Sequence, residues 1–218
     1  MPSSTVENYL KAILRLSKDG GGLVPIGRIA TALGLTPGTV TTMMKHLDGE
    51  GFVRYLPRKG VELRDEGRRA ALQVLRRHRL IELFLVEVLQ LDWAHVHEEA
   101  EVLEHVLSDR LVERIDEMLG RPAYDPHGDP IPDAKGVMRE DDLRFLTDCG
   151  PGDYRLARIT RDDPEFLSWL QEEGLRPGVS VEVVGRDPLA GTVEIRVGDA
   201  RGALRVAESV AGVLAVER

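Results

Sequence analysis

The sequence predicts a mainly helical protein that ends in a small β domain. Apolar residues recur at helical period through roughly the first 120 residues. Short strand-like runs separated by glycine or proline dominate the last third of the chain. Apolar residues make up 42% and charged residues 30% of the 218 residues, which is typical of a globular protein rather than a disordered or membrane one. A chain of this length can hold two or three small domains.

Two helices are predicted near the N-terminus. Ser4 and Glu7 have the spacing of a capping box, so we expect the first helix to start near Ser4. It should end at Gly20–Gly21–Gly22, because glycine runs interrupt helices. The second helix is expected at about Ile26–Leu33, with Gly34 as its C-terminal stop.

A third helix and a hairpin complete a winged helix-turn-helix. Thr36 is a good N-cap and Pro37 suits the first helical position. Two short helices with a tight turn between them are a helix-turn-helix. Phe52–Leu56 and Val61–Leu63 then read as a hairpin with a basic tip, Pro57–Gly60. The combination is typical of a DNA-binding module.

The charge of the chain is unevenly distributed, which supports this interpretation. The formal net charge is −8, but residues 1–72 hold 11 basic and 7 acidic residues, a net charge of +4. The remainder therefore carries −12. A basic N-terminal part on an acidic body suits a DNA-binding module attached to a part that binds cations or dimerises.

Three more helices and a small barrel are predicted beyond the wing. The helices are expected at Asp65–Gln90, from Asp92 through Leu107, and from Ser108 to Gly120. A Pro/Gly-rich loop, Pro122–Pro132, and a polar linker, Asp133–Asp142, follow. Strands are then expected at Tyr154–Thr160, Ser180–Gly185, Thr192–Val197 and Leu204–Val206, with a short helix at Pro164–Glu173.

Potential metal ligands are concentrated in one segment. Between Leu80 and Asp109 there is no lysine or arginine. The same segment holds eight carboxylates and three imidazoles: Glu82, Glu87, Asp92, Glu98, Glu99, Glu101, Glu104, Asp109, His95, His97 and His105. Uncompensated carboxylates on neighbouring helices repel one another unless a cation neutralises them.

Helical spacing brings several of these side chains to one face. Four of them fall within an arc of about 100°: His97, Glu101, Glu104 and His105. His78 and Glu82 form an i, i+4 pair on the preceding helix. A single such residue is usually a solvated surface residue, but two such faces in contact gather three imidazoles and three carboxylates. This donor set, without thiolate, suits Mn²⁺ or Fe²⁺, with Zn²⁺ or Co²⁺ also possible.

Other classes of protein are disfavoured. The single cysteine, Cys149, excludes an internal disulfide framework and a zinc site made only of cysteines. No apolar run approaches the roughly 20 residues that span a bilayer, and no secretory signal is visible, so we expect a cytoplasmic protein with no membrane association. A metal-dependent hydrolase is disfavoured because no spare nucleophile or phosphate-binding glycine loop is present. A winged-helix regulator that senses an organic ligand remains an alternative.

Four stretches of the sequence resemble the diphtheria toxin repressor family of metal-dependent transcriptional regulators. They are Glu7–Leu10, Arg77–Glu82, Val96–His105 and Asp125–Pro132. The resemblance covers almost the whole chain, and Glu173–Gly178 suggests an SH3-like C-terminal domain. It implies a winged helix-turn-helix DNA-binding domain, a helical metal-binding and dimerisation domain and an SH3-like domain, at residues 1–72, 73–140 and 150–218.

The resemblance also implies two metal sites per subunit. A primary, switching site would use Asn8, Glu101, Glu104 and His105. An ancillary site would use His78, Glu82 and His97, completed either by Asp162 and Glu165 or by Asp125 and His127.

Two departures from the family bear on the metal. Iron-type members tend to have Cys at the position of Glu101 and Met at that of Asn8, so oxygen ligands here favour Mn²⁺ and leave Fe²⁺ open. Manganese-type members often have Asp where this chain has Asn8, and some have Glu where it has Lys11. A close two-metal cluster through Lys11 is therefore not expected.

The implied function is a homodimeric repressor of metal-uptake genes that binds a palindromic operator in double-stranded DNA when the ion is plentiful. The third helix would read bases through Thr36, Pro37, Gly38, Thr39, Thr41 and Thr42. Phosphates would be held by Arg28, Lys45, Arg54, Arg58 and Lys59. The apolar face of the helices from Trp93 to Leu119 would form the twofold interface.

Overall fold

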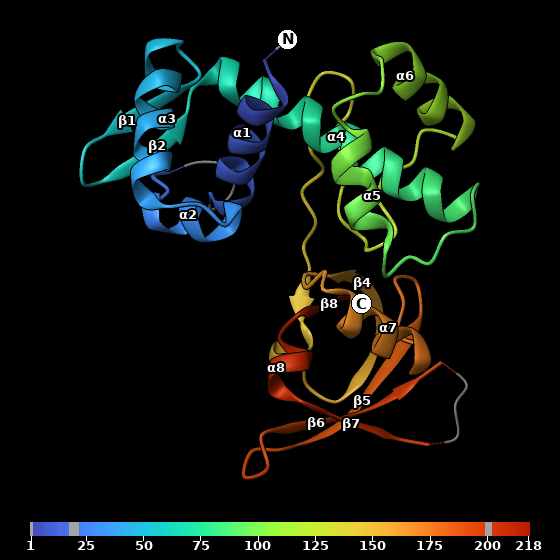
Figure 1. The fold of residues 1–218 in the computed structure, drawn as a ribbon. Helices are drawn as coiled ribbons and strands as arrows, with labels where there is room; N and C mark the ends of the chain where they lie inside the picture. The colour runs from blue at the N-terminus through green and yellow to red at the C-terminus, as the bar shows by residue number, and fades with distance from the viewer. Residues whose placement is uncertain (1, 18–21, 199–201) are drawn as a thin grey trace. The chain divides into compact units, whose positions relative to one another are not determined.

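A computed structural model describes residues 2–17, 22–198 and 202–218, and confirms a mainly helical chain with a small β domain (Figure 1). The first helix ends at Leu16, before the expected stop at Gly20–Gly22, of which Gly20 and Gly21 lie outside the described residues. The chain divides into two compact units. The first holds the chain up to His78, Glu104–Val106 and Pro132–Val137; the second holds Arg79–Leu103, Leu107–Ile131 and Met138–Arg218.

The helices among the described residues are α1 (Ser4–Leu16), α2 (Ile26–Leu33), α3 (Pro37–Gly49), α4 (Asp65–Glu87), α5 (Val96–Leu103), α6 (Asp109–Met118), α7 (Pro164–Glu172) and α8 (Glu208–Ala211), with a 3-10 turn at Leu146–Asp148. The strands there are β1 (Val53–Leu56), β2 (Gly60–Leu63), β3 (Arg144–Phe145), β4 (Gly152–Ile159), β5 (Ser180–Asp187), β6 (Thr192–Val197), β7 (Leu204–Ala207) and β8 (Leu214–Glu217).

The helix-turn-helix forms where its sequence signals predict it. Gly34 ends α2 with a left-handed φ of 65°, a conformation that glycine adopts without steric cost. Thr36 caps α3 by accepting the backbone N–H of Thr39 at 3.2 Å. The cap of α1 was predicted one residue too late, because Ser3 rather than Ser4 accepts the N–H of Val6.

The wing is an antiparallel hairpin that is held against the rest of the first unit. β1 pairs with β2 from Val53↔Leu63 to Leu56↔Gly60, as expected, and β1 packs beside α3 (Figure 1). Val24 exchanges two backbone hydrogen bonds with Val61, at 2.7 and 2.9 Å. This third strand-like contact ties β2 to the segment before α2 at a point one residue from the turn of the hairpin.

The helices of the second unit pack through two small apolar clusters. Ile81 and Leu85 of α4 pack against Val96 and Ala100 of α5. Leu80 packs with residues of α6 and of the following loop. α4 ends three residues before the expected Gln90.

α5 is much shorter than predicted, since it spans only Val96–Leu103 and the chain turns at Glu104–Val106. The last turn of α5 has no basic residue, whereas carboxylates are unfavourable at the negative C-terminal end of a helix dipole. The prediction that Glu104 and His105 lie on one helical face with His97 and Glu101 was therefore wrong. α6 begins at its Ser108 cap, as expected.

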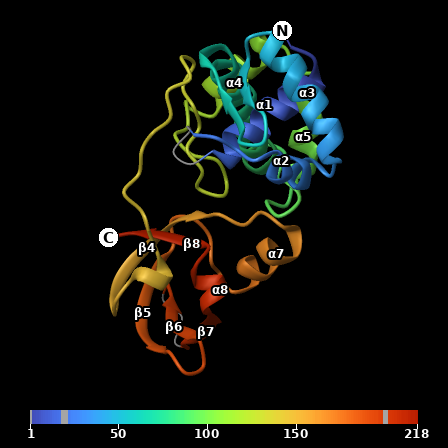
Figure 2. The ribbon, with the colours of Figure 1, turned by 90° about the vertical axis from the view of Figure 1, so that its left-hand side faces the viewer.

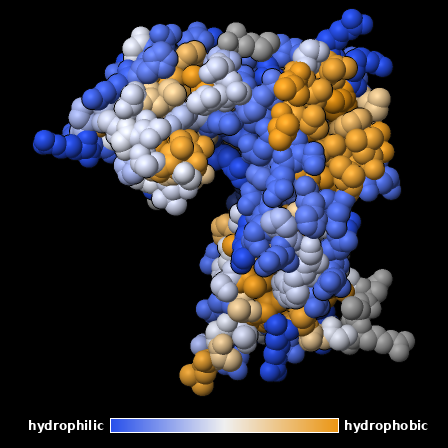
Figure 3. All heavy atoms as spheres, viewed as in Figure 1, coloured by the Kyte–Doolittle hydropathy of each residue, from blue (hydrophilic) through white to orange (hydrophobic). Residues whose placement is uncertain are grey.

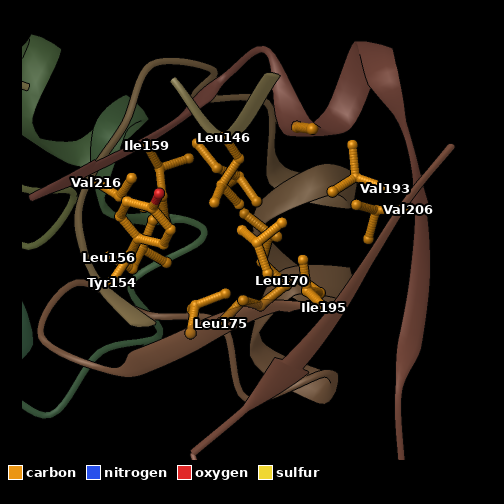
Figure 4. Packing of buried hydrophobic residues seen from close by; sticks show 14 of the residues in the cluster. Leu146, Tyr154, Leu156, Ile159, Leu170, Leu175, Val193, Ile195, Val206 and Val216 are labelled. Carbon is orange, nitrogen blue, oxygen red and sulfur yellow. The ribbon is translucent and has the colours of Figure 1, made fainter. Parts of the chain in front are cut away.

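The C-terminal part of the second unit is a six-stranded antiparallel sheet in the order β3-β8-β4-β5-β6-β7 (Figures 1 and 2). Alternate residues of the strands point into one core, as Leu156, Ile195 and Val216 do in Figure 4. The four predicted strands and α7 are present, but β3, β8 and α8 were not predicted. β3 has only two residues, so its own periodicity gives no signal.

Candidate metal centre and DNA interface

Six polar side chains converge in the first unit, and we call them the α1 cluster: Glu7, Asn8, Lys11, His78, Glu104 and His105. α1 supplies the first three, the end of the unit's share of α4 supplies His78, and the turn after α5 supplies the last two. The ring of His105 lies between two side-chain oxygens. Its Nδ1 is 2.7 Å from Glu7 Oε2 and its Nε2 is 2.7 Å from Asn8 Oδ1.

Glu104 is the centre of the α1 cluster and has no solvent exposure. Its Oε2 lies 2.7 Å from Nδ1 of His78. Its Oε1 lies 2.5 Å from the Lys11 ammonium and 3.3 Å from Nε2 of His105. A carboxylate withdrawn from water in this way requires positive partners or hydrogen-bond donors, because an isolated buried charge is strongly destabilising.

Three further ligand-type side chains converge in the second unit, and we call them the loop cluster: Glu82, Asp125 and His127. All three are buried, and their candidate ligand atoms lie within 4.8 Å of one another. His97 lies beside them, with its Nδ1 3.0 Å from Glu82 Oε1. Its Nε2 is 3.5 Å from Glu101 Oε1, one helical turn further along α5.

The loop that carries Asp125 and His127 has a fixed shape. Asp125 Oδ1 accepts the backbone N–H groups of His127 and Asp129, both at 2.9 Å. Gly128 follows with a φ of 87°, and a Cβ there would lie only 1.9 Å from the backbone oxygen of Ala157. Only glycine therefore fits at this close approach, which holds the loop against β4.

The electrostatic environment of Asp125 differs from that of a surface carboxylate. Burial, with the nearby charges of Asp129 and Glu82, raises the pKa of the Asp125 carboxyl to about 8, although Arg79 acts in the opposite direction. The guanidinium of Arg79 lies 3.5 Å from Asp125. Two buried acids beside one another favour a cation between them, because a divalent ion relieves their mutual repulsion.

The donor atoms fit a hard or borderline divalent ion. Both clusters offer imidazole nitrogen with carboxylate or amide oxygen, and neither includes a sulfur atom. Asn8, Glu104 and His105 are brought together as the family resemblance implies, whereas Glu101, the fourth residue of that set, contacts His97. His78, which the resemblance assigns to the ancillary site, also has its Nδ1 2.7 Å from Glu104 Oε2.

Of the two residue pairs that could complete the ancillary site, one lies in a ligand cluster and the other does not. Asp125 and His127 join Glu82 in the loop cluster. Asp162 and Glu165 are exposed, and neither belongs to a three-residue ligand group within the ranges that the structure describes.

Two members of the α1 cluster were missed as site residues. Glu7 was interpreted as part of a capping box, yet it is buried and contacts both His105 and Arg77. Lys11 is buried as well. The signal was their i, i+4 spacing on an otherwise apolar face of α1, which includes Leu10 and Leu14.

The expected DNA-contacting residues lie on α3, on the wing and on α2. Nearly all of them are exposed: Arg28, Thr36, Pro37, Gly38, Thr39, Thr42, Lys45, Arg54, Arg58 and Lys59, with Thr41 half-buried. The hydroxyls of Thr41 and Thr42 donate to the carbonyls of Pro37 and Gly38, at 2.7 and 3.1 Å. Their methyl groups and oxygen lone pairs are what remains for a partner, which suits contacts to thymine methyl groups.

Comparison with known proteins assigns the chain to a family. Residues 1–61 match the iron-dependent repressor N-terminal DNA-binding domain, and residues 64–133 match the iron-dependent repressor metal-binding and dimerisation domain. Residues 146–216 match the FeoA domain. The diphtheria toxin repressor of Corynebacterium efficiens is 33% identical over 193 residues, which is 83% of each chain. The chain belongs to the diphtheria toxin repressor family.

Three further proteins are similar to this chain along most of its length. The iron-dependent repressor IdeR of Mycobacterium tuberculosis is 35% identical over 199 residues, covering 82% of this chain and 83% of IdeR. A manganese-dependent transcriptional repressor solved with manganese is 36% identical, with a TM-score of 0.87 over 97% of this chain and 98% of that one. ScaR with bound Cd²⁺ is 35% identical, with a TM-score of 0.80 over the full length of both chains. The chain is thus a metal-dependent DNA-binding repressor and not an enzyme.

Proposed function

We propose that this repressor binds a palindromic operator as a homodimer when Mn²⁺ is plentiful, and thereby silences genes of metal uptake; Fe²⁺ is the second candidate ion. The observation that carries the proposal is the 2.7 Å contact between Asn8 of α1 and His105 of the turn after α5. It links the helix that precedes the helix-turn-helix to the acidic helical segment. An ion held there ties metal occupancy to the orientation of the DNA-reading helices.

We assign the primary site to Asn8, Glu104 and His105, with Glu101 included on the strength of the family resemblance. The side chains of Glu104 and His105 already lie within 3.3 Å of each other. Asn8 is a neutral ligand, so the negative charge at this site comes from the carboxylates. When bound, the ion supplies positive charge that attracts these oxygens and this imidazole to one point. The chain's own contribution is to hold them near that point in advance.

We assign a second site to the loop cluster, with His97 beside it. Burial of Glu82, Asp125 and His127 supports this choice over Asp162 and Glu165. The absence of sulfur from both donor sets favours Mn²⁺ over softer ions. Among the relatives, one repressor is described as manganese-dependent and in complex with manganese, and ScaR is described with bound Cd²⁺ or Zn²⁺.

The DNA-binding surface is proposed to be α3 with the wing. Arg28, Lys45 and Arg58 are exposed basic residues of α2, α3 and the wing tip, which suits phosphate contacts. Thr39 and Thr42 on α3 would meet base edges, with shape and thymine methyl groups supplying most of the sequence choice. In a twofold dimer the two recognition helices would lie about 34 Å apart, one turn of DNA, so the operator would be palindromic.

The dimer interface is proposed on the second unit, where apolar side chains gather over α6 and the end of α4 (Figure 3). We call this surface the apolar face: Val88, Leu89, Leu91, Val102, Leu111 and Met118, which are 43–65% exposed. A patch of this kind is costly in water and indicates an interface. We assign the domains to residues 1–72, 73–140 and 150–218.

We propose that the protein acts in the cytoplasm, where operator DNA is accessible. None of the helices in the described ranges is long and apolar enough to cross a membrane.

Operator binding with and without metal tests the proposed function. Fluorescence anisotropy with DNA fragments from the promoters of metal-uptake genes should show tight binding in Mn²⁺ or Fe²⁺ and loss of binding after chelation. Re-addition of Mn²⁺ should restore it. Equal affinity in chelator and in metal would contradict the proposal and would favour a regulator that responds to an organic ligand.

A further inference from the structure

Lys11 is a buried cation inside the α1 cluster. Its exposed fraction is 5%, and its ammonium Nζ lies 2.5 Å from Oε1 of Glu104, which is fully buried. The two residues are 93 positions apart in the sequence. An ammonium at this distance from a carboxylate oxygen stabilises its negative charge in surroundings where water cannot do so.

The ammonium occupies the carboxylate oxygen that an ion in the proposed primary site would need. Glu104 Oε1 is also the oxygen that lies 3.3 Å from His105 Nε2, so it faces the interior of the donor set. Glu7, the other carboxylate of the cluster, is approached by Arg77 at 3.4 Å. Two carboxylates thus face two basic groups before any metal arrives, and a divalent ion would add two further positive charges to a balanced cluster.

We propose that Lys11 is a built-in counter-cation that competes with the metal for Glu104 and so sets the metal concentration at which the repressor responds. The inference rests on the proposed primary site. Binding of the ion requires the ammonium to leave Glu104, which the flexible four-carbon stem of lysine permits. The ammonium also takes the place of a second ion beside Glu104, so the site holds a single divalent ion.

The variant Lys11→Met tests this role, because methionine keeps an unbranched apolar stem and removes the charge. Without metal, the variant should unfold at a lower temperature than the wild type, since Glu104 loses its counter-ion. Its affinity for Mn²⁺, measured by calorimetric titration without DNA, should rise by roughly 10- to 100-fold, the range over which neighbouring groups tune metal sites. Lys135→Met, at an exposed lysine of the linker, should change neither quantity.

The double variant Lys11→Met/Glu104→Gln keeps the result interpretable if Lys11→Met folds poorly without metal. Removing both charges should restore the stability of the metal-free protein and should leave only the titration of the second proposed site. Unchanged or weaker Mn²⁺ binding by Lys11→Met, with normal binding by the wild type, would overturn the role of Lys11 alone. A wild type that binds no Mn²⁺ would overturn both this role and the proposed function.

Discussion

Replacing Glu104 with glutamine is expected to weaken Mn²⁺-dependent operator binding by about 100-fold or more, as loss of a charged ligand weakens metal sites at least as much as loss of a supporting group. Glutamine has nearly the same shape, so packing around the fully buried side chain is kept. The negative charge is lost, however, and the Lys11 ammonium remains to repel the ion. Fluorescence anisotropy over a Mn²⁺ titration would measure the effect.

Glu99→Gln is the matched control for this experiment. Glu99 lies on α5, five residues before Glu104, and is exposed. Its replacement removes the same charge from the same acidic segment and should leave the Mn²⁺ response within about twofold of the wild type, as is usual for exposed surface positions. Circular dichroism should show that both variants are folded. A normal metal response in folded Glu104→Gln would contradict the assignment of the primary site.

Replacing Met118 with glutamate is expected to dissociate the dimer and to abolish operator binding with it. Met118 is 61% exposed at the end of α6 and belongs to the apolar face. In a twofold interface the new charge appears twice, and each unpaired buried charge costs about 3–5 kcal/mol. Sedimentation at about 10 µM protein, a concentration at which a dimer of about 8 kcal/mol affinity would still form, should show the mass of one chain.

Leu189→Glu is the control for the dimer experiment, because Leu189 is fully exposed in the turn between β5 and β6 and lies outside the apolar face. This substitution adds the same charge at an exposed leucine and should leave the protein dimeric. If Met118→Glu still sedimented as a dimer, the interface would have to lie elsewhere on the chain.

The parts of the fold that depend on local signals could be predicted from the sequence. Gly34, Thr36 and Pro37 each act through their own backbone geometry or cap, so the bounds of α2 and the start of α3 were correct. The missed strands depend on distant partners instead. Arg144 and Phe145 become a strand only by pairing with Val216 and Ala215, some 70 residues later. No local pattern contains that information.

The donor types of the site could be predicted, but their grouping could not. A long run without lysine or arginine identified the acidic segment. The predicted grouping, however, assumed one helix through Leu107, and α5 ends at Leu103. The early end of α5 places Glu104 and His105 in a turn, where they meet α1. Lys11 was considered only as the replacement of a possible ligand, because a charge on an N-terminal helix does not reveal a partner 93 residues away.

The number of Mn²⁺ ions retained per chain, measured by equilibrium dialysis and elemental analysis, tests the central claim that the α1 cluster holds the regulatory ion. The wild type is expected to retain two ions at saturation and Glu104→Gln only one. The ion that the variant loses should be the one whose binding coincides with operator binding in the wild type. Two retained ions in folded Glu104→Gln, or none in the wild type at saturating Mn²⁺ or Fe²⁺, would contradict the account.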